Sequence, residues 1–327
     1  MKHFAKKLIA SICSATMLAG AAFAPSFSIE ASAASGTVTV NGVTYDYVQD
    51  YMGVAITKCY ANGKQSVTIP NQISTSDGVQ DVLAIYDNAF YGSSVNSIVN
   101  LYMNSGSKIY KIGKNFCRNC DNLQTIQLST KLTQIGDYSF YDTDGLHSIT
   151  FPNSVKRIGA YVCNWSWNLY DVTIGSDVEI IGANAFGRMR DLNNFNSSSS
   201  SLIYQVGEGV LANSKWANDR ADDDALYIGY NNRVLLRWQR GGTNPTVTLG
   251  NNVRVLADKA FGGTWAGSHY VRTIICPRVE YIGNSVFTSV PSATVRFSAS
   301  IMYNRYGNDY ATYVSNLCAP ATVVFMH

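Results

Sequence analysis

The sequence is poor in charged residues and in histidine. Charged side chains make up 14% of its 327 residues, there are four histidines, and the formal net charge is +3. Proteins that bind nucleic acids carry lysine and arginine clustered on a basic surface, and this composition provides no such surface. Hydrophobic residues make up 46%, which is enough for a large or an extended core. We therefore exclude nucleic acid as a partner and look for function on a nearly neutral surface.

Long apolar runs are also scarce, and the one that stands out is near the N-terminus. Lys2, Lys6 and Lys7 precede it. The run spans 8–23, and Ala-Ser-Ala at 31–33 offers the small residues of a cleavage site. This order is typical of a secretory signal peptide, because the run is shorter than the ~20 residues of a membrane-spanning helix.

Cleavage after the signal peptide removes three lysines and one glutamate, which lowers the net charge from +3 to +1. The remaining sequence has no second long apolar run, no cysteine placed for lipid attachment and no sorting motif. We expect a secreted, extracellular protein without a membrane span, either free or held non-covalently at the cell surface.

In place of catalytic motifs, the chain repeats a hexapeptide in which Ile-Gly is followed by three variable residues and a closing Phe or Cys. Four copies follow one another at a spacing of 23 residues, at 112–117, 135–140, 158–163 and 181–186. Looser copies lie at 85–90, 206–211, 256–261 and 282–287. Self-similarity at such a period is typical of a solenoid, because one coil cannot bury its apolar face without stacking on its neighbours.

A second pattern lies between the hexapeptides and predicts one short strand per coil. In the stretch 123–128, Ile126 and Leu128 alternate with polar residues, which indicates a half-buried strand. We expect strands centred near residues 126, 149, 172 and 274, stacked in parallel ~4.8 Å apart.

The hexapeptide itself predicts a corner of each coil. Its glycine falls where the chain turns or approaches the next coil closely. Its closing residues form an inner column, namely Phe90, Cys117, Phe140, Cys163, Phe186, Phe261 and Phe287.

The combined pattern, Leu-x-x-Ile-x-(Leu/Ile/Phe)-x-x-x-Val-x-x-Ile-Gly-x-x-(Ala/Ser)-Phe, resembles the BspA-type leucine-rich repeats of bacterial surface and secreted proteins. The stretch 40–70 is similar to the atypical first coil of such arrays, and 207–214 with 233–238 is similar to an interruption common among them. The chain departs from the family at Cys117, Cys163, Trp165, Trp167 and the polar segment 212–225. The resemblance implies a right-handed β-rich solenoid and a role in binding, but no residue-level function, because such families share a scaffold rather than a site.

The fold class that we predict is therefore a leucine-rich-repeat solenoid, with stacked short parallel strands on one side and short turns or helical turns on the other. Five segments follow from the pattern: a signal peptide at 1–33, an N-terminal cap at 34–84, regular repeats at 85–203, an irregular coil at 204–250, and last repeats with a C-terminal cap at 251–327.

Six cysteines remain after cleavage, namely Cys59, Cys117, Cys120, Cys163, Cys276 and Cys318. An even number in a secreted protein suggests disulfides. However, Cys117 and Cys163 share a column two coils apart, ~10 Å by strand spacing and beyond the ~7 Å reach of a disulfide. We expect buried thiols that pack as small hydrophobic residues. A Cys117–Cys120 bridge is the second interpretation, and zinc the third, because there is no second Cys-x-x-Cys or histidine pair.

Candidate binding residues lie on the outward side of the strands and on one edge of the coils. The outward strand positions are Thr125, Gln127, Ser148, Thr150, Asp171, Thr173, Asn194 and Asn196. Trp167 and Trp265 each follow a closing residue by four positions, so we place them on one edge, with Trp165 nearby. Such aromatic residues anchor ligands in many interfaces, although they can equally fold over and cover the edge.

These observations favour an adhesin-like protein that binds an extracellular protein or glycan. We expect it to act as a monomer, without catalysis, cofactor or metal. The alternative is an extracellular enzyme or enzyme accessory with a site in 204–250. That hypothesis requires the acidic residues of 219–224 to converge with His147 and His269, although their spacing matches no EF-hand loop and suits a solvated loop.

Overall fold

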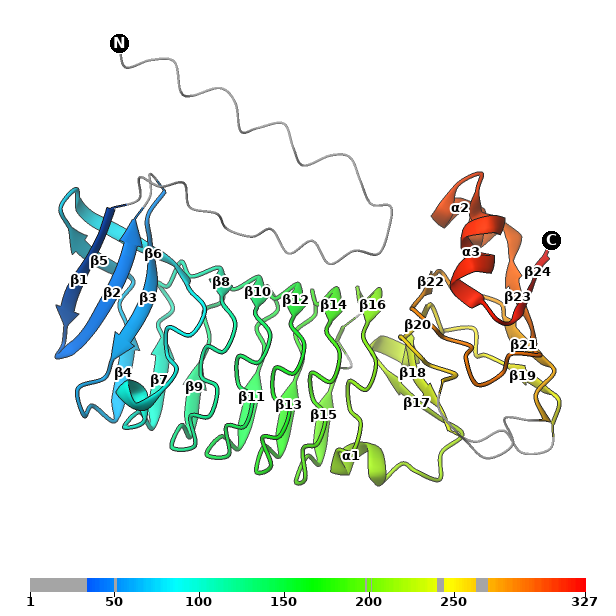
Figure 1. Ribbon diagram of the computed structural model, residues 1–327, viewed down its shortest axis with the longest axis horizontal. Helices are drawn as coiled ribbons and strands as arrows, with labels where there is room; N and C mark the ends of the chain where they lie inside the picture. The colour runs from blue at the N-terminus through cyan, green and yellow to red at the C-terminus, as the bar shows by residue number, and fades with distance from the viewer. Residues whose placement is uncertain (1–33, 50–51, 198, 201, 240–243, 263–269) are drawn as a thin grey trace, which may run out of the picture. The chain divides into compact units, whose positions relative to one another are not determined.

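The computed structural model describes the chain from Ala34 onward, apart from residues 50–51, 198, 201, 240–243 and 263–269. The expected signal peptide, Trp265 and His269 lie outside the described residues. Residues from Ala34 to His327 form one compact unit, in which successive coils stack side by side (Figure 1). Among the helices of the described part, none is long and apolar enough to cross a membrane.

An antiparallel sheet covers the N-terminal end of the stacked coils. It is built by β1 (Ala34–Val40), β2 (Val43–Gln49) and β3 (Val54–Tyr60), paired in that order. Alternate residues of β2 are buried, as expected for a strand with one face on the core. β3 then pairs in parallel with β6 (Gly78–Ile85), which itself forms a hairpin with β5 (Gln72–Thr75). A short 3-10 helix, η1 (Ser93–Val95), follows.

In the first ladder of parallel strands, each regular coil contributes a strand that ends at the Ile of the hexapeptide, just before its Gly. The members of this ladder after β6 are two residues long: β8 (Lys111–Ile112), β10 (Gln134–Ile135), β12 (Arg157–Ile158), β14 (Ile180–Ile181) and β16 (Gln205–Val206). From β8 to β14, paired residues are 23 positions apart. The sequence predicted turns on this side of the coil, so the ladder adds a second sheet to the predicted one.

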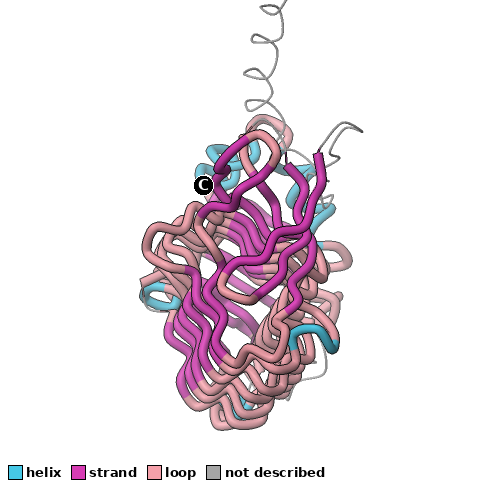
Figure 2. Tube along the Cα trace, turned by 90° about the vertical axis from the view of Figure 1, so that its left-hand side faces the viewer, coloured by secondary structure: helices cyan, strands magenta, loops and turns pink. Residues whose placement is uncertain are grey.

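The second ladder contains the predicted strands. The members of this ladder up to β21 are β4 (Ser66–Ile69), β7 (Asn100–Met103), β9 (Thr125–Gln127), β11 (Ser148–Thr150), β13 (Asp171–Thr173), β15 (Asn194–Asn196), β19 (Thr246–Thr248) and β21 (Thr273–Cys276). The prediction of parallel strands near 126, 149, 172 and 274 is confirmed, but they belong to three separate sheets: β4-β7-β9, β11-β13-β15 and the sheet that begins with β19. Figure 2, seen from the N-terminal end, shows the strands lying one behind another.

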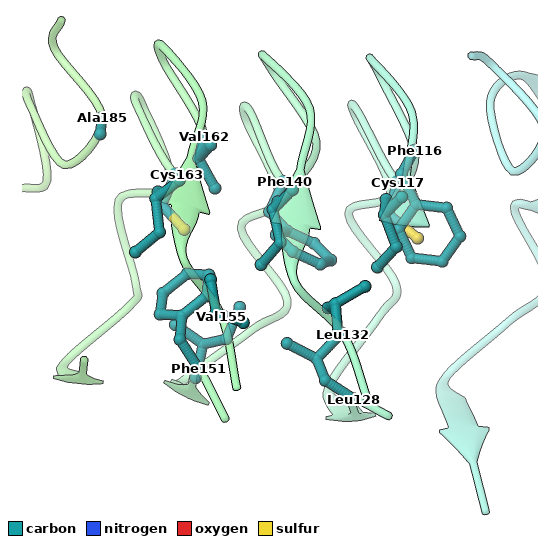
Figure 3. Close-up of a cluster of buried hydrophobic side chains, with 14 of the residues drawn as sticks. Phe116, Cys117, Leu128, Leu132, Phe140, Phe151, Val155, Val162, Cys163 and Ala185 are labelled. Atoms are coloured by element: carbon teal, nitrogen blue, oxygen red, sulfur yellow. The ribbon is translucent and has the colours of Figure 1, made fainter. Parts of the chain in front are cut away.

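The predicted inner column of closing residues is buried throughout, and its two cysteines are accompanied by extra aromatic rings (Figure 3). Next to Cys117, the ring of Phe116 lies 5.0 Å from that of Phe90 and 5.9 Å from that of Phe140. These rings therefore continue the aromatic column where the closing position supplies only a thiol.

A different residue compensates at the second cysteine of the column. In the coil of Cys163, the ring of Phe151 lies 5.8 Å from that of Phe186. The corresponding positions in the adjacent coils hold Leu128 and Ile174, which are smaller. The aromatic packing is thus kept although the ring comes from a different part of the coil.

Close contact between adjacent coils explains the fixed glycine. A Cβ atom on Gly136 would lie 2.5 Å from the carbonyl carbon of Gly113 in the preceding coil, which leaves space only for hydrogen. The next residue, Asp137, ties the coils together, because its Oδ1 accepts the backbone N–H of Ala160 at 2.9 Å. The prediction of close approach at this corner is confirmed.

An antiparallel hairpin interrupts the row of parallel coils. It consists of β17 (Ala225–Ile228) and β18 (Val234–Trp238), with the short helix α1 (Lys215–Asn218) before it and η2 (Tyr230–Asn232) at its turn. The hairpin separates two hydrophobic clusters. Leu226 belongs to the N-terminal cluster, whereas its neighbour Ala225 belongs to the C-terminal one.

The C-terminal part resumes both ladders and ends in two helices. β20 (Val255–Leu256) and β22 (Tyr281–Ile282) extend the sheet of β18. The other sheet continues from β21 through β23 (Thr294–Ser298) to β24 (Thr322–Met326), in parallel. Helices α2 (Ala299–Tyr306) and α3 (Tyr310–Cys318) connect these last two strands.

Candidate functional site: a polar strand face and a tryptophan edge

The outward positions of the second ladder form a small-residue polar face. All eight predicted residues lie on strands, and they are exposed except for Asp171 and Thr173, which are half-buried. Six of them share the sheet β11-β13-β15, whereas Thr125 and Gln127 lie on β9 in the neighbouring sheet. Within the face, Asn194 donates a hydrogen bond to Asp171 across adjacent strands, with Nδ2 and Oδ1 2.5 Å apart.

Two of the three predicted tryptophans lie together on one edge of the coils. The ring centres of Trp165 and Trp167 are 5.7 Å apart. Each ring has a guanidinium over it from the next coil, Arg188 at 4.9 Å from the Trp165 centre and Arg190 at 5.5 Å from the Trp167 centre. We call these four residues the Trp edge. Trp265, the third predicted member, lies outside the described residues.

The exposed side chain of Tyr170 connects the Trp edge to the strand face. It follows Trp167 by three residues and directly precedes Asp171 of β13. Trp167 is 39% exposed and Tyr170 46% exposed. The hydroxyl of Tyr170 accepts a hydrogen bond from Asn193 Nδ2 at 2.9 Å, which fixes the ring beside the next coil. An aromatic surface therefore runs from the edge to the strands.

The backbone at Trp165 has a conformation that large side chains rarely adopt. Its φ is 67°, in the left-handed region, and such a value is an outlier for a bulky residue. The same position is left-handed in four other coils, where it holds Asn119, Asp142, Arg188 and Asn213. The repeat geometry thus imposes the conformation, and a tryptophan is present in spite of it.

Equivalent positions in successive coils of the edge change from acidic to aromatic to basic. Steps of 23 residues give Asp142, Trp165 and Arg188 in one column. The adjacent column contains Asp144, Trp167 and Arg190. Asp144 also holds its neighbour in place, because its Oδ1 accepts the backbone N–H of Trp167 at 2.7 Å. Sequence reasoning identified the tryptophans but missed both arginines, although this column reading finds them.

The acidic side of the edge carries mutually repelling carboxylates. Burial raises the pKa of the Asp142 carboxyl above its usual range, and the neighbouring Asp144 raises it further. The pKa of Asp121 is likewise raised, first by burial and then by Asp142 and Asp144. The side chains along the edge therefore change from acidic in the coil before the two tryptophans to basic in the coil after them.

The remaining tryptophans have packing roles. Trp216 is 8% exposed, and the Arg220 guanidinium lies 4.1 Å from its ring centre. Trp238 stacks on Phe261 with ring centres 5.5 Å apart. These two tryptophans pack against neighbouring side chains and do not belong to the candidate binding surface.

A hollow of about 580 Å³ lies in the interrupted region, where the alternative hypothesis placed an enzyme site. Its ionisable residues include Glu208 and Lys259, which form an ion pair, and Asp258, whose pKa is raised by burial. Asp258 has a structural role, since its Oδ1 accepts the backbone N–H of Asn284 at 2.7 Å, as Asp137 does in its own coil.

The acidic and histidine residues named for that hypothesis lie elsewhere. Asp222, Asp223 and Asp224 are exposed and do not line the hollow. His147 is exposed beside β11, with Nδ1 2.9 Å from the carbonyl oxygen of Gly145. Over the part of the chain that the structure describes, no group of three or more His, Cys, Asp and Glu is placed to hold a metal.

The prediction of buried thiols is confirmed for the six cysteines of the described part, which are all buried and free. Burial raises the pKa of Cys59 and of Cys318 to about 12. Burial also raises the pKa of Cys117, and its hydrogen bond with Cys120 adds to the shift. The Cys-x-x-Cys stretch therefore belongs to the core.

Residues 83–217 match the family model of the BspA type leucine rich repeat region, in six copies. This region is a BspA-type leucine-rich repeat. Repeats of this type occur in bacterial surface proteins and are generally protein-binding scaffolds. The predicted family is confirmed for residues 83–217, and the predicted repeat solenoid is confirmed.

Several solved structures of leucine-rich repeat proteins are similar to the chain. One, from T. pallidum, is 20% identical, with 69% of this chain and 87% of that chain covered and a TM-score of 0.40. A leucine rich cell surface protein from Faecalibacterium prausnitzii is 15% identical, with 89% and 94% covered and a TM-score of 0.40. A third, from Bacteroides capillosus, is 24% identical, with 42% and 97% covered and a TM-score of 0.36. Among curated proteins, none matches the chain.

Proposed function

We propose that this leucine-rich-repeat protein is secreted and acts as an adhesin-like binding protein, without catalysing a reaction. Its ligand is an extracellular protein or glycan, held on the outward face of β11, β13 and β15 and on the adjoining Trp edge. The protein acts as a monomer and needs no cofactor or metal.

The observation that carries this proposal is the placement of the two tryptophans. Trp165 occupies a left-handed backbone position at which a large side chain is unfavourable, and Trp167 is 39% exposed to solvent. Residues held in unfavourable backbone conformations cluster at functional sites. Binding energy in protein interfaces is concentrated in a few Trp, Tyr and Arg residues, and the Trp edge with Tyr170 supplies all three types.

The strand face supports the proposal in a second way. Its outward residues present hydroxyl and amide groups and the carboxylate of Asp171, on strands ~4.8 Å apart. Such a surface can form many hydrogen bonds but has no strong anchor. The aromatic residues at its border provide that anchor, and the polar face sets the orientation of the ligand.

Binding of residues 34–327 to a glycan array and to bacterial or host surface proteins tests the proposal. We expect the double variant Trp165→Ala/Trp167→Ala to bind its partner about 10-fold more weakly or worse, the loss typical of interface anchors. The thermal midpoint should change by less than about 4 °C, since few core contacts are removed. Tyr230→Ala is the matched control, because Tyr230 is 55% exposed and lies on η2 away from the edge.

The opposite pattern would contradict the proposal. If the double variant loses stability while its affinity is unchanged, the two tryptophans are packing residues. A partner that binds the Tyr230→Ala and the double variant equally well would place the site elsewhere on the protein.

A further inference from the structure

A hollow of about 390 Å³ opens at the C-terminal side of the Trp edge. Its lining comes from three adjacent segments: Trp165, Arg188, Arg190, Asn213, Lys215 and Asn218. The volume lies in the lower part of the range of small-molecule sites, about 300–1,000 Å³. Three of the six lining side chains are cationic, and the other polar ones are amides.

One cation of the hollow has no anionic partner. Arg190 forms an ion pair with Asp191, with Nε and Oδ1 3.0 Å apart, and Lys215 pairs with Asp219. Within the described residues, the guanidinium of Arg188 makes no hydrogen bond and no ion pair, and its contact is the ring of Trp165. A planar guanidinium presents several N–H donors in a fixed fork that matches a carboxylate or sulfate.

The amide side chains of the hollow are also available. Asn213 and Asn218 are exposed, and their side-chain amides have no hydrogen-bond partner among the residues described. Each amide offers both donors and an acceptor, which suits hydroxyl groups. The hollow therefore combines one anion-binding group with two groups that recognise hydroxyls.

Within the hollow, the guanidinium of Arg188 lies over the ring of Trp165, on the face where a neutral sugar would stack. Arg188 covers the ring of Trp165, and Trp167 lies 5.7 Å from that ring. A ligand in the hollow would therefore meet the guanidinium of Arg188 rather than the ring face. The carboxylates of Asp142 and Asp144, one coil before the tryptophans, repel an anion from the opposite side.

We propose that this hollow binds a sugar that carries an acidic group, a carboxylate or a sulfate. The acidic group pairs with Arg188, and the sugar hydroxyls bind Asn213 and Asn218. An acidic peptide side chain would satisfy the arginine but would leave the two amides without hydroxyl partners, so the lining favours a sugar. This inference rests on the proposed binding function and specifies one class of ligand for its edge.

Calorimetric titration of residues 34–327 with four probes tests the inference. The probes are a trimer of galacturonic acid, a carrageenan tetrasaccharide that carries sulfate but no carboxylate, the neutral trisaccharide maltotriose, and a glutamate-rich peptide. We expect at least one acidic sugar to bind about 10-fold more tightly than maltotriose, as is typical for one charge-assisted contact. The stronger of the two acidic sugars identifies the group as carboxylate or sulfate.

Variants locate the site. Arg188→Gln should weaken binding of the acidic sugar about 10-fold and leave maltotriose unchanged, and Lys215→Gln should weaken it by a smaller factor. Arg296→Gln is the matched control, because Arg296 is exposed on β23, outside the hollow. All three replaced side chains lie at or near the surface, so the thermal midpoints should agree with the parent protein.

Three results would overturn the inference: equal affinity for maltotriose and the acidic sugars, unchanged affinity in Arg188→Gln, or binding of the glutamate-rich peptide alone. None of them would affect the proposed binding function if the Trp165→Ala/Trp167→Ala variant still binds the partner from the glycan array or surface proteins more weakly than the parent protein does. Conversely, if the double variant binds its partner with unchanged affinity, the proposed function is wrong, whichever of the sugars bind.

Discussion

Phe116 illustrates how individual residues adjust to one another inside a regular repeat. The equivalent positions in neighbouring coils hold Ala89 and Ser139, which are much smaller, while the next position is Phe in those coils and Cys117 in this one. The order of large and small residues is therefore exchanged within a single coil. In the arrangement present here, the ring of Phe116 lies between the rings of Phe90 and Phe140.

This exchange gives a prediction at the residue scale. Phe116→Ala alone should reduce the free energy of unfolding by about 3–5 kcal/mol, because it leaves a cavity between two rings. Cys117→Phe alone should reduce it by about 1–3 kcal/mol through overpacking. The double variant restores the common order and should recover more than half of the sum of these losses. Chemical denaturation measures all four proteins, and simple additivity of the two changes would contradict the compensation.

The residue scale also shows where sequence reasoning reached its limit. The column of closing residues and the burial of Cys117 and Cys163 follow from the 23-residue register alone. The rings of Phe116 and Phe151 that accompany the two thiols could not be predicted, because packing depends on side-chain directions that the register does not contain. The column reading finds Arg188 and Arg190, but the positions of their guanidinium groups over the tryptophan rings could not be predicted for the same reason.

Successive coils approach each other closely at the fixed glycine, beside the short strands of the first ladder. The predicted strands such as β11 and β13 alternate polar and apolar residues and are therefore visible in the sequence. The first ladder escaped prediction because its strands, such as β10, are two residues long, too short for any alternation to show. The fixed glycine next to each of these short strands was visible in the sequence. The close contact between adjacent coils explains why this position is always glycine.

That contact gives a prediction at the element scale. Gly136→Ala should lower the free energy of unfolding by at least about 1–3 kcal/mol, because the added methyl meets the backbone of the preceding coil, which cannot move as a side chain would. Gly250→Ala is the matched control, since a Cβ there would meet nothing within 4 Å. Urea denaturation of both variants measures the difference. Equal losses would show that the coils have room to separate at this corner.

At the scale of the whole described unit, the β17–β18 hairpin divides the core. Alternate residues of its strands face the N-terminal cluster and the C-terminal cluster, so each cluster is completed by one side of the hairpin. The sequence showed that the repeat is interrupted here, but not that the interruption is antiparallel. Pairing direction depends on contacts between distant residues, and a single irregular coil carries no register that would reveal it.

The divided core gives a prediction for hydrogen exchange. Ile274→Ala, in the C-terminal cluster, should speed amide exchange in β19, β21 and β23 while β10, β12 and β14 keep their protection. Ile158→Ala, in the N-terminal cluster, should do the reverse. Both residues are 0% exposed, so the two changes are matched in burial, and each should cost about 2–5 kcal/mol. Exchange that accelerates throughout the unit in either variant would show one cooperative core.

The left-handed position that carries Trp165 allows leucine-rich-repeat solenoids to vary a surface side chain while the backbone stays the same. In five successive coils this position keeps one backbone conformation while its side chain is Asn119, Asp142, Trp165, Arg188 or Asn213. The backbone conformation is set by the adjacent coils, so a mutation there changes what the surface displays without changing the path of the chain. Lineages that share this scaffold can therefore diverge in ligand preference through single substitutions at these surface positions, while selection for folding acts on the buried columns beneath them.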